Sequence, residues 1–290
     1  MPLGVRYMIL SAFAFSVMSA FVKAASLNGI PALEIVAARA LISLTISYFL
    51  VKRKGIPVFG NQKGWLFLRG LLGFIALTFV FYALTHLPLA EATALQYLHP
   101  MFTAILAVFF LNERPTLGTI ICITLSMVGL LVIIRPDFVF YEHSGRFETL
   151  AIAAAILGAL GSASAYILVK KLSEKEDPLV IVMYFPLVSL PGTMPFLWNN
   201  FVVPEGIAWL YLLGVGLTTQ VGQVALTKGM QLETASRATS FSYLQVVFAI
   251  FLGMVFYAEI PSLWTVVGAC IIVGGSYASI VWKKQQEQVV

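Results

Sequence analysis

Charge is scarce in this sequence. Only 11% of its 290 residues are Lys, Arg, Asp or Glu, whereas 60% are hydrophobic, and the mean hydropathy is +0.92. An ordinary soluble domain carries roughly a quarter charged residues, because its surface must stay in water. The low charge excludes a soluble globular protein and indicates a polytopic membrane protein.

The residues that usually carry chemistry are scarce too. The chain has three His, two Cys and only two Asp, Asp137 and Asp177, both in predicted loops. It contains neither HExxH nor GxSxG, the signatures of common metal- and serine-dependent hydrolases. Cys122 and Cys270 fall inside predicted spans, where a thiol behaves as a small hydrophobe. An intramembrane enzyme is therefore a disfavoured alternative class, and we expect no catalytic residue, metal site, disulfide or cofactor.

Long apolar runs fill the chain instead. Ten of them are long enough for a helix rising 1.5 Å per residue to cross roughly 30 Å of hydrocarbon. The predicted spans are 5–25, 31–51, 65–84, 89–111, 116–134, 148–169, 178–197, 207–227, 235–257 and 262–282. Pro186, Pro191 and Pro195 interrupt the seventh span, because proline removes helical hydrogen bonds. The first run is interpreted as a retained span, since no small-residue cleavage site of a signal peptide is clear.

The net charge of +5 reflects membrane topology rather than a nucleic-acid partner. With the N-terminus in the cytoplasm, fourteen Lys and Arg, Arg69 among them, fall on the cytoplasmic side, and three fall on the other side. Cytoplasmic loops of membrane proteins carry such an excess. The sequence therefore predicts a multi-pass protein of the cytoplasmic (inner) membrane, with the lipid bilayer around it and both termini in the cytoplasm. It predicts no nucleic-acid partner and leaves a homodimer open.

The chain contains an internal repeat. At an offset of 146, residues 91–130 align with 237–276 without a gap, and twelve of these 40 positions are identical. The match includes Glu113-x-Pro115 and Glu259-x-Pro261, which we interpret as capping and turn devices before spans 5 and 10. We expect two five-span repeats, 1–134 and 148–290, joined by a loop at 135–147. Because five is odd, the second repeat enters the membrane from the opposite side, which gives the inverted symmetry of transporters.

A set of motifs runs through the first repeat. They are Arg69-Gly70-Leu71-Leu72-Gly73, Ala83-Leu84, Pro88-Leu89-Ala90-Glu91-Ala92, Pro100 and Leu111-Asn112-Glu113-Arg114-Pro115. These motifs resemble the EamA group of the drug/metabolite transporter superfamily, which also tends to place a Lys and an Arg where Lys23 and Arg39 stand. The resemblance implies an all-α polytopic membrane protein with ten transmembrane helices as two inverted five-helix repeats. It further implies that spans 1–4 and 6–9 surround a central cavity and that spans 5 and 10 lie at the periphery. The chain departs from the pattern at Phe15-Ser16 and at Val246.

Span 4 carries a polar face halfway through the membrane. Helical spacing places Ala92, Gln96, His99 and Thr103 on one side of the span. Pro100 lacks an N–H and so frees the carbonyl of Gln96 as an acceptor. Two interpretations stay open, namely hydrogen bonding to a neighbouring helix and the lining of a cavity. His99 is also a candidate proton carrier, because histidine changes charge near neutral pH.

Other polar residues fall on spans expected to line the cavity. The substrate-binding candidates are His99, Gln96, Arg39, Tyr82, Ser19, Gln223, Gln245 and Ser242, and the gate or coupling candidates are Glu91, Arg237, Lys23 and Glu34. Arg39 either binds a substrate carboxylate or joins an internal ion pair. Lys23 and Glu34 are spaced to pair with each other. Glu91 and its repeat mate Arg237 are either gate residues or rim charges that face water.

These features predict a secondary transporter that moves a small molecule by alternating access. The first span lacks the buried glutamate that the related small multidrug pumps use for cationic drugs, as the resemblance implies. Together with Arg39, Lys23 and His99, this absence favours a zwitterion or organic anion such as an amino acid. A nucleoside-like metabolite such as S-adenosylmethionine, a substrate known among EamA relatives, is the alternative.

Overall fold

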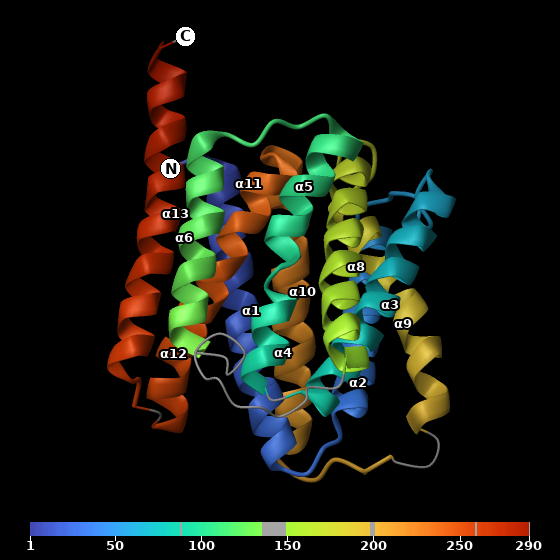
Figure 1. Ribbon diagram of the computed structural model, residues 1–290. Helices are drawn as coiled ribbons and strands as arrows, with labels where there is room; N and C mark the ends of the chain where they lie inside the picture. Colours follow the sequence, from blue (N-terminus) through green and yellow to red (C-terminus); the bar gives the residue numbers. More distant parts are fainter. Residues whose placement is uncertain (88, 135–148, 198–200, 259, 290) are drawn as a thin grey trace.

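The computed structural model shows a bundle of long helices (Figure 1) and describes residues 1–87, 89–134, 149–197, 201–258 and 260–289. The helices are α1 Leu3–Leu27, α2 Ala32–Arg53, α3 Lys63–His86, α4 Leu89–Gln96, α5 His99–Leu111, α6 Leu117–Ile134, α8 Thr149–Ser173, α9 Pro178–Leu197, α10 Ala208–Leu232, α11 Ala235–Ser240, η1 Phe241–Tyr243, α12 Leu244–Tyr257 and α13 Leu263–Val289. The linking loop predicted at 135–147 lies outside the described residues.

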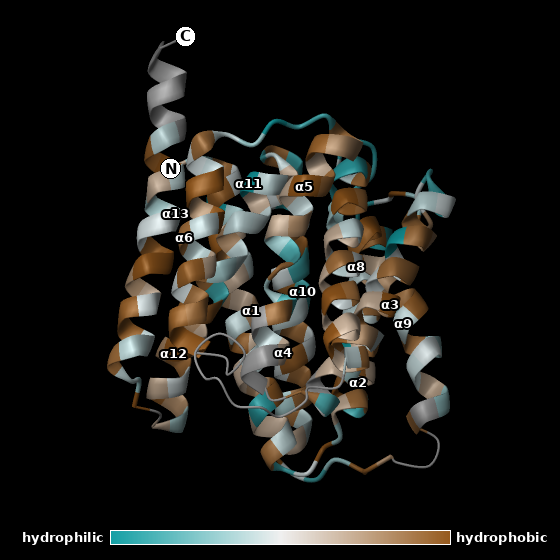
Figure 2. Ribbon diagram, in the orientation of Figure 1, coloured by the Kyte–Doolittle hydropathy of each residue, from teal (hydrophilic) through white to brown (hydrophobic). Residues whose placement is uncertain are grey.

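The predicted spans are confirmed as helices. Nine segments of described residues are long and apolar enough to cross a membrane, and they correspond to every predicted span except the fourth. α9 remains one helix although it contains three prolines. Proline is tolerated in transmembrane helices because neighbouring groups and local adjustments satisfy the freed backbone groups. Figure 2 shows hydrophobic residues along the helices and hydrophilic ones mainly near their ends, so this is a multi-pass membrane protein.

Spans 4 and 9 are both interrupted near the middle. Span 4 divides into α4 and α5 just before His99, and span 9 divides into α11, η1 and α12. Pro100 explains the first interruption, because it can donate no backbone hydrogen bond. The second copy has Val246 at the equivalent position and is interrupted nevertheless. The interruption is therefore shared by the two repeats, and a proline alone does not explain it.

A tyrosine pair joins the two interruptions. Tyr97 and Tyr243 are repeat mates, and their ring centroids lie 5.7 Å apart with an interplanar angle of 27°. The hydroxyl of Tyr243 donates a hydrogen bond of 2.9 Å to the carbonyl oxygen of Tyr97. Mates related by a two-fold axis contact each other only near that axis. The pair therefore marks where the symmetry axis passes through the molecule.

The helix contacts follow the symmetry of the repeats. α1 packs along α10 as its repeat mate α8 packs along α3, and α2 contacts α10 as α9 contacts α3. The contact between α1 and α12 likewise has its counterpart between α8 and α5. In Figure 1 α1 runs downward from the N-terminus, whereas α8 runs upward. The two repeats are inverted, as predicted.

Spans 5 and 10 form a pair at the periphery of the bundle, where α6 packs along α13 (Figure 1). At their crossing a Cβ built on Gly129 would lie 2.6 Å from the carbonyl oxygen of Gly268. The repeat mates of these residues are Gly275 and Cys122, and a Cβ on Gly275 would lie 3.3 Å from the carbonyl oxygen of Cys122. Small residues let membrane helices approach closely. The contact of α6 with α13 therefore depends on Gly129 and Gly268.

We expect Gly268→Ala to destabilise the protein, because its methyl group would meet the Gly129 backbone and force α6 and α13 apart. Overpacking of this kind costs about 1–3 kcal/mol. The midpoint of thermal unfolding in detergent measures the effect. Gly274→Ala is the matched control in the same helix, since a Cβ there meets nothing within 4 Å. Equal midpoints for the two variants would show that the backbones of α6 and α13 do not touch.

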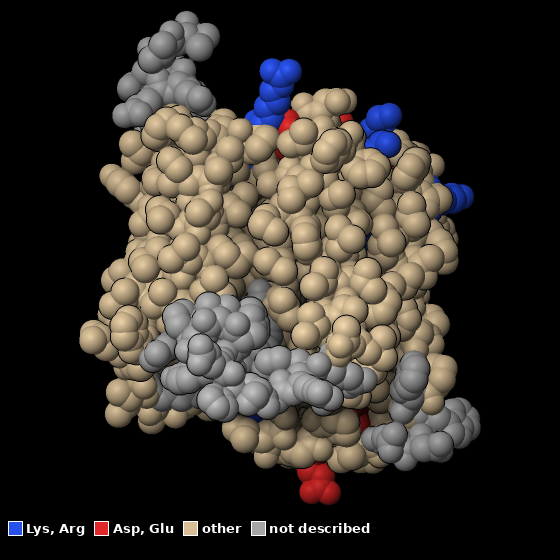
Figure 3. Space-filling model, in the orientation of Figure 1, with Lys and Arg blue, Asp and Glu red and all other residues tan. Residues whose placement is uncertain are grey.

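The two ends of the bundle differ in charge. Figure 3 shows Lys and Arg at the end where the N-terminus lies, and we call this end, which also holds the α2–α3 connection 54–62, the basic end. The opposite end holds the α1–α2 connection 28–31. That the basic end faces the cytoplasm remains a prediction from the charge distribution.

Candidate functional site

A cavity of about 450 Å³ lies within the bundle, beside the interruption of span 4. Its lining residues come from α1, α2, α3, α8, α9, α10 and α12 and from the junction of α4 with α5. All eight spans expected around a cavity therefore contribute to it, whereas α6 and α13 do not. Of the described residues that line it, none is Asp or Glu, and two are arginines, Arg39 and Arg69.

The cavity continues toward the opposite end. A second cavity of about 980 Å³ shares Leu77 and Phe81 with it and extends to Pro31 at the start of α2. Phe201 and Val202, which also line this outer cavity, are 57% and 42% exposed. The central cavity is therefore adjacent to an outer cavity whose lining is partly exposed at the opposite end.

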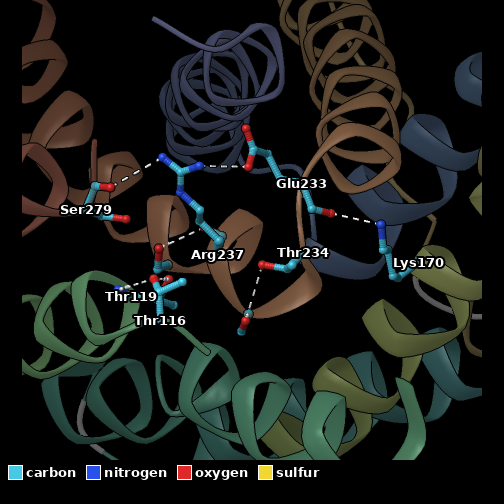
Figure 4. A network of polar contacts seen from close by, with 9 residues as sticks. Thr116, Thr119, Lys170, Glu233, Thr234, Arg237 and Ser279 are labelled. Atoms are coloured by element: carbon cyan, nitrogen blue, oxygen red, sulfur yellow. Dashed lines mark hydrogen bonds and ion pairs between the residues drawn. The ribbon is translucent and has the colours of Figure 1, made fainter. Parts of the chain in front are cut away.

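At the basic end a buried ion pair lies between the helices. Nη1 of Arg237 in α11 lies 2.9 Å from Oε2 of Glu233, and their side chains are only 5% and 4% exposed. Nη2 of Arg237 donates to the carbonyl oxygen of Ser279 in α13, and Nζ of Lys170 in α8 donates to the carbonyl oxygen of Glu233 (Figure 4). Because Arg237 is buried, its interpretation as a rim charge facing water is wrong. The side chain of its mate Glu91 lies outside the described residues.

Glu113 adds a further contact at this end. Both of its carboxylate oxygens accept from the backbone N–H of Ala235, at 3.0 and 2.8 Å, and so cap the start of α11. The repeated Glu-x-Pro was expected to cap the helix that follows it, and Glu113 instead caps a helix of the other repeat. An acid there also complements the positive end of the helix dipole. Glu259, its mate, lies outside the described residues.

The α2–α3 connection contacts α9 and the connection between α8 and α9 at the same end. Oε1 of Glu176 accepts from the backbone N–H groups of Asn61 and Gln62 at 2.7 and 2.6 Å. The hydroxyl of Tyr184 donates to the carbonyl oxygen of Phe59 at 2.9 Å. These contacts join the two repeats, so the basic end is held shut while the opposite end is accessible.

The two arginines of the cavity lie against one aromatic ring. The guanidinium carbons of Arg39 and Arg69 lie 5.4 and 5.5 Å from the ring centroid of Phe185 in α9. Arg69 is only 4% exposed, and its Nε and Nη1 have no hydrogen-bond partner among the described residues. Its Nη2 lies 3.4 Å from Oε1 of Gln223. No ion pair with a described residue involves either arginine.

Arg69 is the site residue that the sequence interpretation missed. The prediction placed it on the cytoplasmic flank, and this is wrong because it lies about 9 Å beyond the first residue of α3 at 1.5 Å per residue. The cost of placing a charge within a membrane span was the signal that could have identified it.

His99 lies in the wall of the cavity and is 8% exposed. Its ring centroid lies 5.3 Å from that of Tyr166 and 5.9 Å from that of Tyr97, and its Nδ1 has no partner among the described residues. Gln96 lines the cavity too. Thr103 instead donates to the carbonyl oxygen of His99 within its own helix. Of the predicted stripe, Gln96 and His99 therefore line the cavity, whereas Thr103, one turn beyond His99 in α5, does not.

The remaining binding candidates divide among three places. Ser19, Gln223 and Gln245 line the central cavity. Ser242 lines a small pocket beside His99, and Tyr82 lines the outer cavity. The structure thus brings six of the eight candidates, including Arg39, Gln96 and His99, into one cavity.

Lys23 and Glu34 do not form the pair that their spacing allowed. Nζ of Lys23 lies 4.5 Å from the ring centroid of Tyr257 in α12. Oε2 of Glu34 accepts from the backbone N–H of Val202 at 2.9 Å, and its Oε1 has no partner among the described residues. The hydroxyl of Tyr257 donates to the carbonyl oxygen of Ala20. Lys23 and Glu34 therefore both lie toward the opposite end of the molecule, but they contact different groups.

Comparisons with known proteins agree with this architecture. The model of the EamA-like transporter family matches residues 2–135 and 149–281. The pseudopaline exporter CntI of Pseudomonas aeruginosa is 33% identical over 271 residues, which are 93% of each chain. The S-adenosylmethionine uptake transporter of Rickettsia felis is 29% identical over 71% of this chain and 68% of its own. A solved crystal structure superposes with a TM-score of 0.79 over 96% of this chain and 98% of that one, and its 18% identity indicates a likeness of fold alone.

Proposed function

The chain belongs to the EamA-like transporter family, and from this premise we propose that it is an alternating-access secondary transporter that carries a small organic anion across the cytoplasmic membrane. The observation that carries the proposal is the central cavity, which adjoins an outer cavity toward one end, whereas contacts between the repeats close the other end. Inverted repeats supply two nearly equivalent states, so exchange between them moves a bound solute.

The charge of the cavity supports an anion over the alternatives. Arg39 and Arg69 both line it, and no described acid does. Arginine stays protonated in proteins and binds carboxylates through paired hydrogen bonds. S-adenosylmethionine, the nucleoside-like alternative, carries a permanent sulfonium charge that two cations would repel. An anion is therefore better matched than a cationic nucleoside, and an amino acid would use only its carboxylate.

The contacts at the basic end are the proposed inner gate. Opening toward that end must separate Arg237 from Ser279, and Lys170 from the carbonyl oxygen of Glu233. Lys23, the mate of Lys170 at an offset of 147, lies toward the opposite end, where its Nζ is 4.5 Å from the ring centroid of Tyr257. Repeat-related residues thus lie at both ends, and each is proposed to close its own entrance in turn. With the basic end in the cytoplasm, the structure is the outward-accessible state.

The proposal predicts that the two ends of the pathway are exposed in turn. Ser19 lines the cavity, whereas Ser236 in α11 is fully buried at the basic end. In a chain whose two native cysteines are replaced by alanine, we expect a membrane-impermeant maleimide to label Ser19→Cys from the side of the opposite end. Ser236→Cys should be labelled more slowly and only from the side of the basic end, because that end opens only in the other state. Oriented vesicles and labelling time courses measure both rates.

Two outcomes would contradict alternating access. If Ser236→Cys stays unlabelled from either side while Ser19→Cys reacts, the basic end does not open. If both cysteines react from the same side, the molecule contains a continuous pore. A cysteine at Ser164, which is half-buried on α8 and does not line the cavity, is the control for reagent that reaches the protein through the bilayer, because its labelling should not depend on the state of the gate.

A further inference from the structure

We propose that the transported solute is an organic dianion, whose two negative charges bind Arg39 and Arg69 in the central cavity. This inference rests on the proposed function and narrows its substrate class. A zwitterion such as an amino acid has a net charge of zero and would leave the positive charge of the cavity unbalanced. Two carboxylates, or one phosphate group, would balance it.

The first support is the state of the Arg69 side chain. It is more than nine-tenths buried, and two of its three guanidinium nitrogens have no acceptor among the described residues. Buried polar groups in proteins are nearly always hydrogen-bonded, and a buried charge without a partner is more costly still. The unpartnered nitrogens belong to a side chain that lines the cavity, so a ligand in the cavity is their available acceptor.

The second support is that the positive charge is doubled. Arg39 lies against the same Phe185 ring as Arg69, so the two like charges raise each other's energy inside the membrane. Charged residues within a membrane usually pair with one another or face a substrate pathway. A single monoanion would neutralise only one of the two charges.

The third support is a contrast within the same chain. Arg237 is buried to a similar degree, and Glu233 lies 2.9 Å from it. A buried arginine at the proposed inner gate therefore has a carboxylate partner from the chain itself. The two arginines of the cavity have none among its described lining residues. Gln96, Gln223 and Gln245 line the same cavity and offer amide groups to the neutral polar part of a solute.

Matched pairs of small anions test the inference on the purified full-length protein. The probes are glutarate with its monoamide, isophthalate with its monoamide, and phenyl phosphate with its methyl ester, at constant ionic strength. We expect at least one dianion to raise the midpoint of thermal unfolding and to bind at least about 30-fold more tightly than its monoanionic partner. The monoanion leaves one of the two buried cations without a partner, and this weakens binding by about that factor. Comparison of the dicarboxylates with phenyl phosphate shows whether the two negative charges come from two carboxylates or from one phosphate group.

Variants then assign the charges to residues. Arg39→Gln should reduce the preference for the dianion over its monoanionic partner to about threefold or less, since one cation remains. Arg39→Lys keeps the charge and should keep most of the preference. Arg6→Gln removes an exposed arginine outside the cavity and should leave it unchanged. Dianion and monoanion binding equally well to the wild-type protein would overturn the inference, and so would stabilisation by none of the dianions. Either result, with alternate labelling of Ser19→Cys and Ser236→Cys intact, would leave the proposed function standing.

Discussion

The Arg69→Met protein is expected to be more stable than the wild-type chain when no ligand is bound. Arg69 is buried, two of its nitrogens lack a partner, and a second cation lies against the same ring. Methionine is unbranched and carries no charge, so the substitution removes a desolvation cost that the hydrogen bond to Gln223 and the contact with Phe185 offset only in part. Replacing buried charge by apolar side chains of similar volume can stabilise a protein by about 1–4 kcal/mol. The thermal unfolding midpoint, followed by tryptophan fluorescence in detergent, measures the gain.

The same substitution should abolish binding of any dianion that stabilises the wild-type protein. Stability and function would then change in opposite directions, as is common where a binding site keeps an unfavourable residue for its ligand. Arg69→Lys is the control, because it retains the charge and should show no gain in stability. A lower midpoint for Arg69→Met would mean that the guanidinium is satisfied in the resting protein. That result would also remove the first support for a dianionic solute.

Arg237→Met is expected to lower the stability of the protein, in contrast to Arg69→Met. The substitution takes the guanidinium away from a Glu233 carboxylate that is 4% exposed. Removing one partner of a buried ion pair destabilises a protein by about 3–5 kcal/mol, since a buried charge is left uncompensated. Since this pair lies at the proposed inner gate, the closed state should be weakened most. We expect a lower unfolding midpoint, together with faster labelling of Ser236→Cys from the basic end.

The double variant Arg237→Met/Glu233→Leu separates charge from packing. Removing both charges should recover most of the lost stability, because replacing a whole buried pair by apolar residues is often neutral or stabilising. If the double variant is as unstable as Arg237→Met, packing rather than charge explains the loss. If Arg237→Met itself unfolds at the wild-type temperature, the ion pair does not hold the basic end shut.

The helices and their symmetry were predictable because both leave a direct trace in the sequence. A membrane span needs a long apolar run whatever packs against it, so hydropathy alone located the helices. The gapless match of 91–130 with 237–276 likewise gave the repeat, and an odd number of spans gave its inversion. Even the interruption of span 4 could be anticipated from Pro100. The equivalent interruption of span 9 could not, because Val246 carries no such signal.

The candidate site was predictable only in part. Gln96 and His99 were located from helical spacing, but Thr103, which lies one turn beyond His99 in α5, is buried and does not line the cavity. Gln220 is a second case in which helical spacing did not identify a cavity residue. It lies three residues before Gln223 in α10, yet its side chain hydrogen-bonds to Ser43 and Ser47 of α2. Which polar residue faces a cavity and which joins two helices depends on the neighbour opposite. A single sequence does not name that neighbour.

The sequence by itself determined that this protein is a membrane-spanning bundle of two inverted repeats, because hydrophobic length and internal similarity are properties of the chain alone. Only the tertiary structure decided where the charges lie. It joined Arg237 to Glu233 at the closed end, and it placed Arg69 beside Arg39 and Phe185 in a cavity whose described lining has no acid. The physical reason is that the energy of a charge in the membrane depends on what lies within a few ångströms of it. For Arg39, Arg69 and Phe185, packing between spans that are distant in the sequence sets that distance.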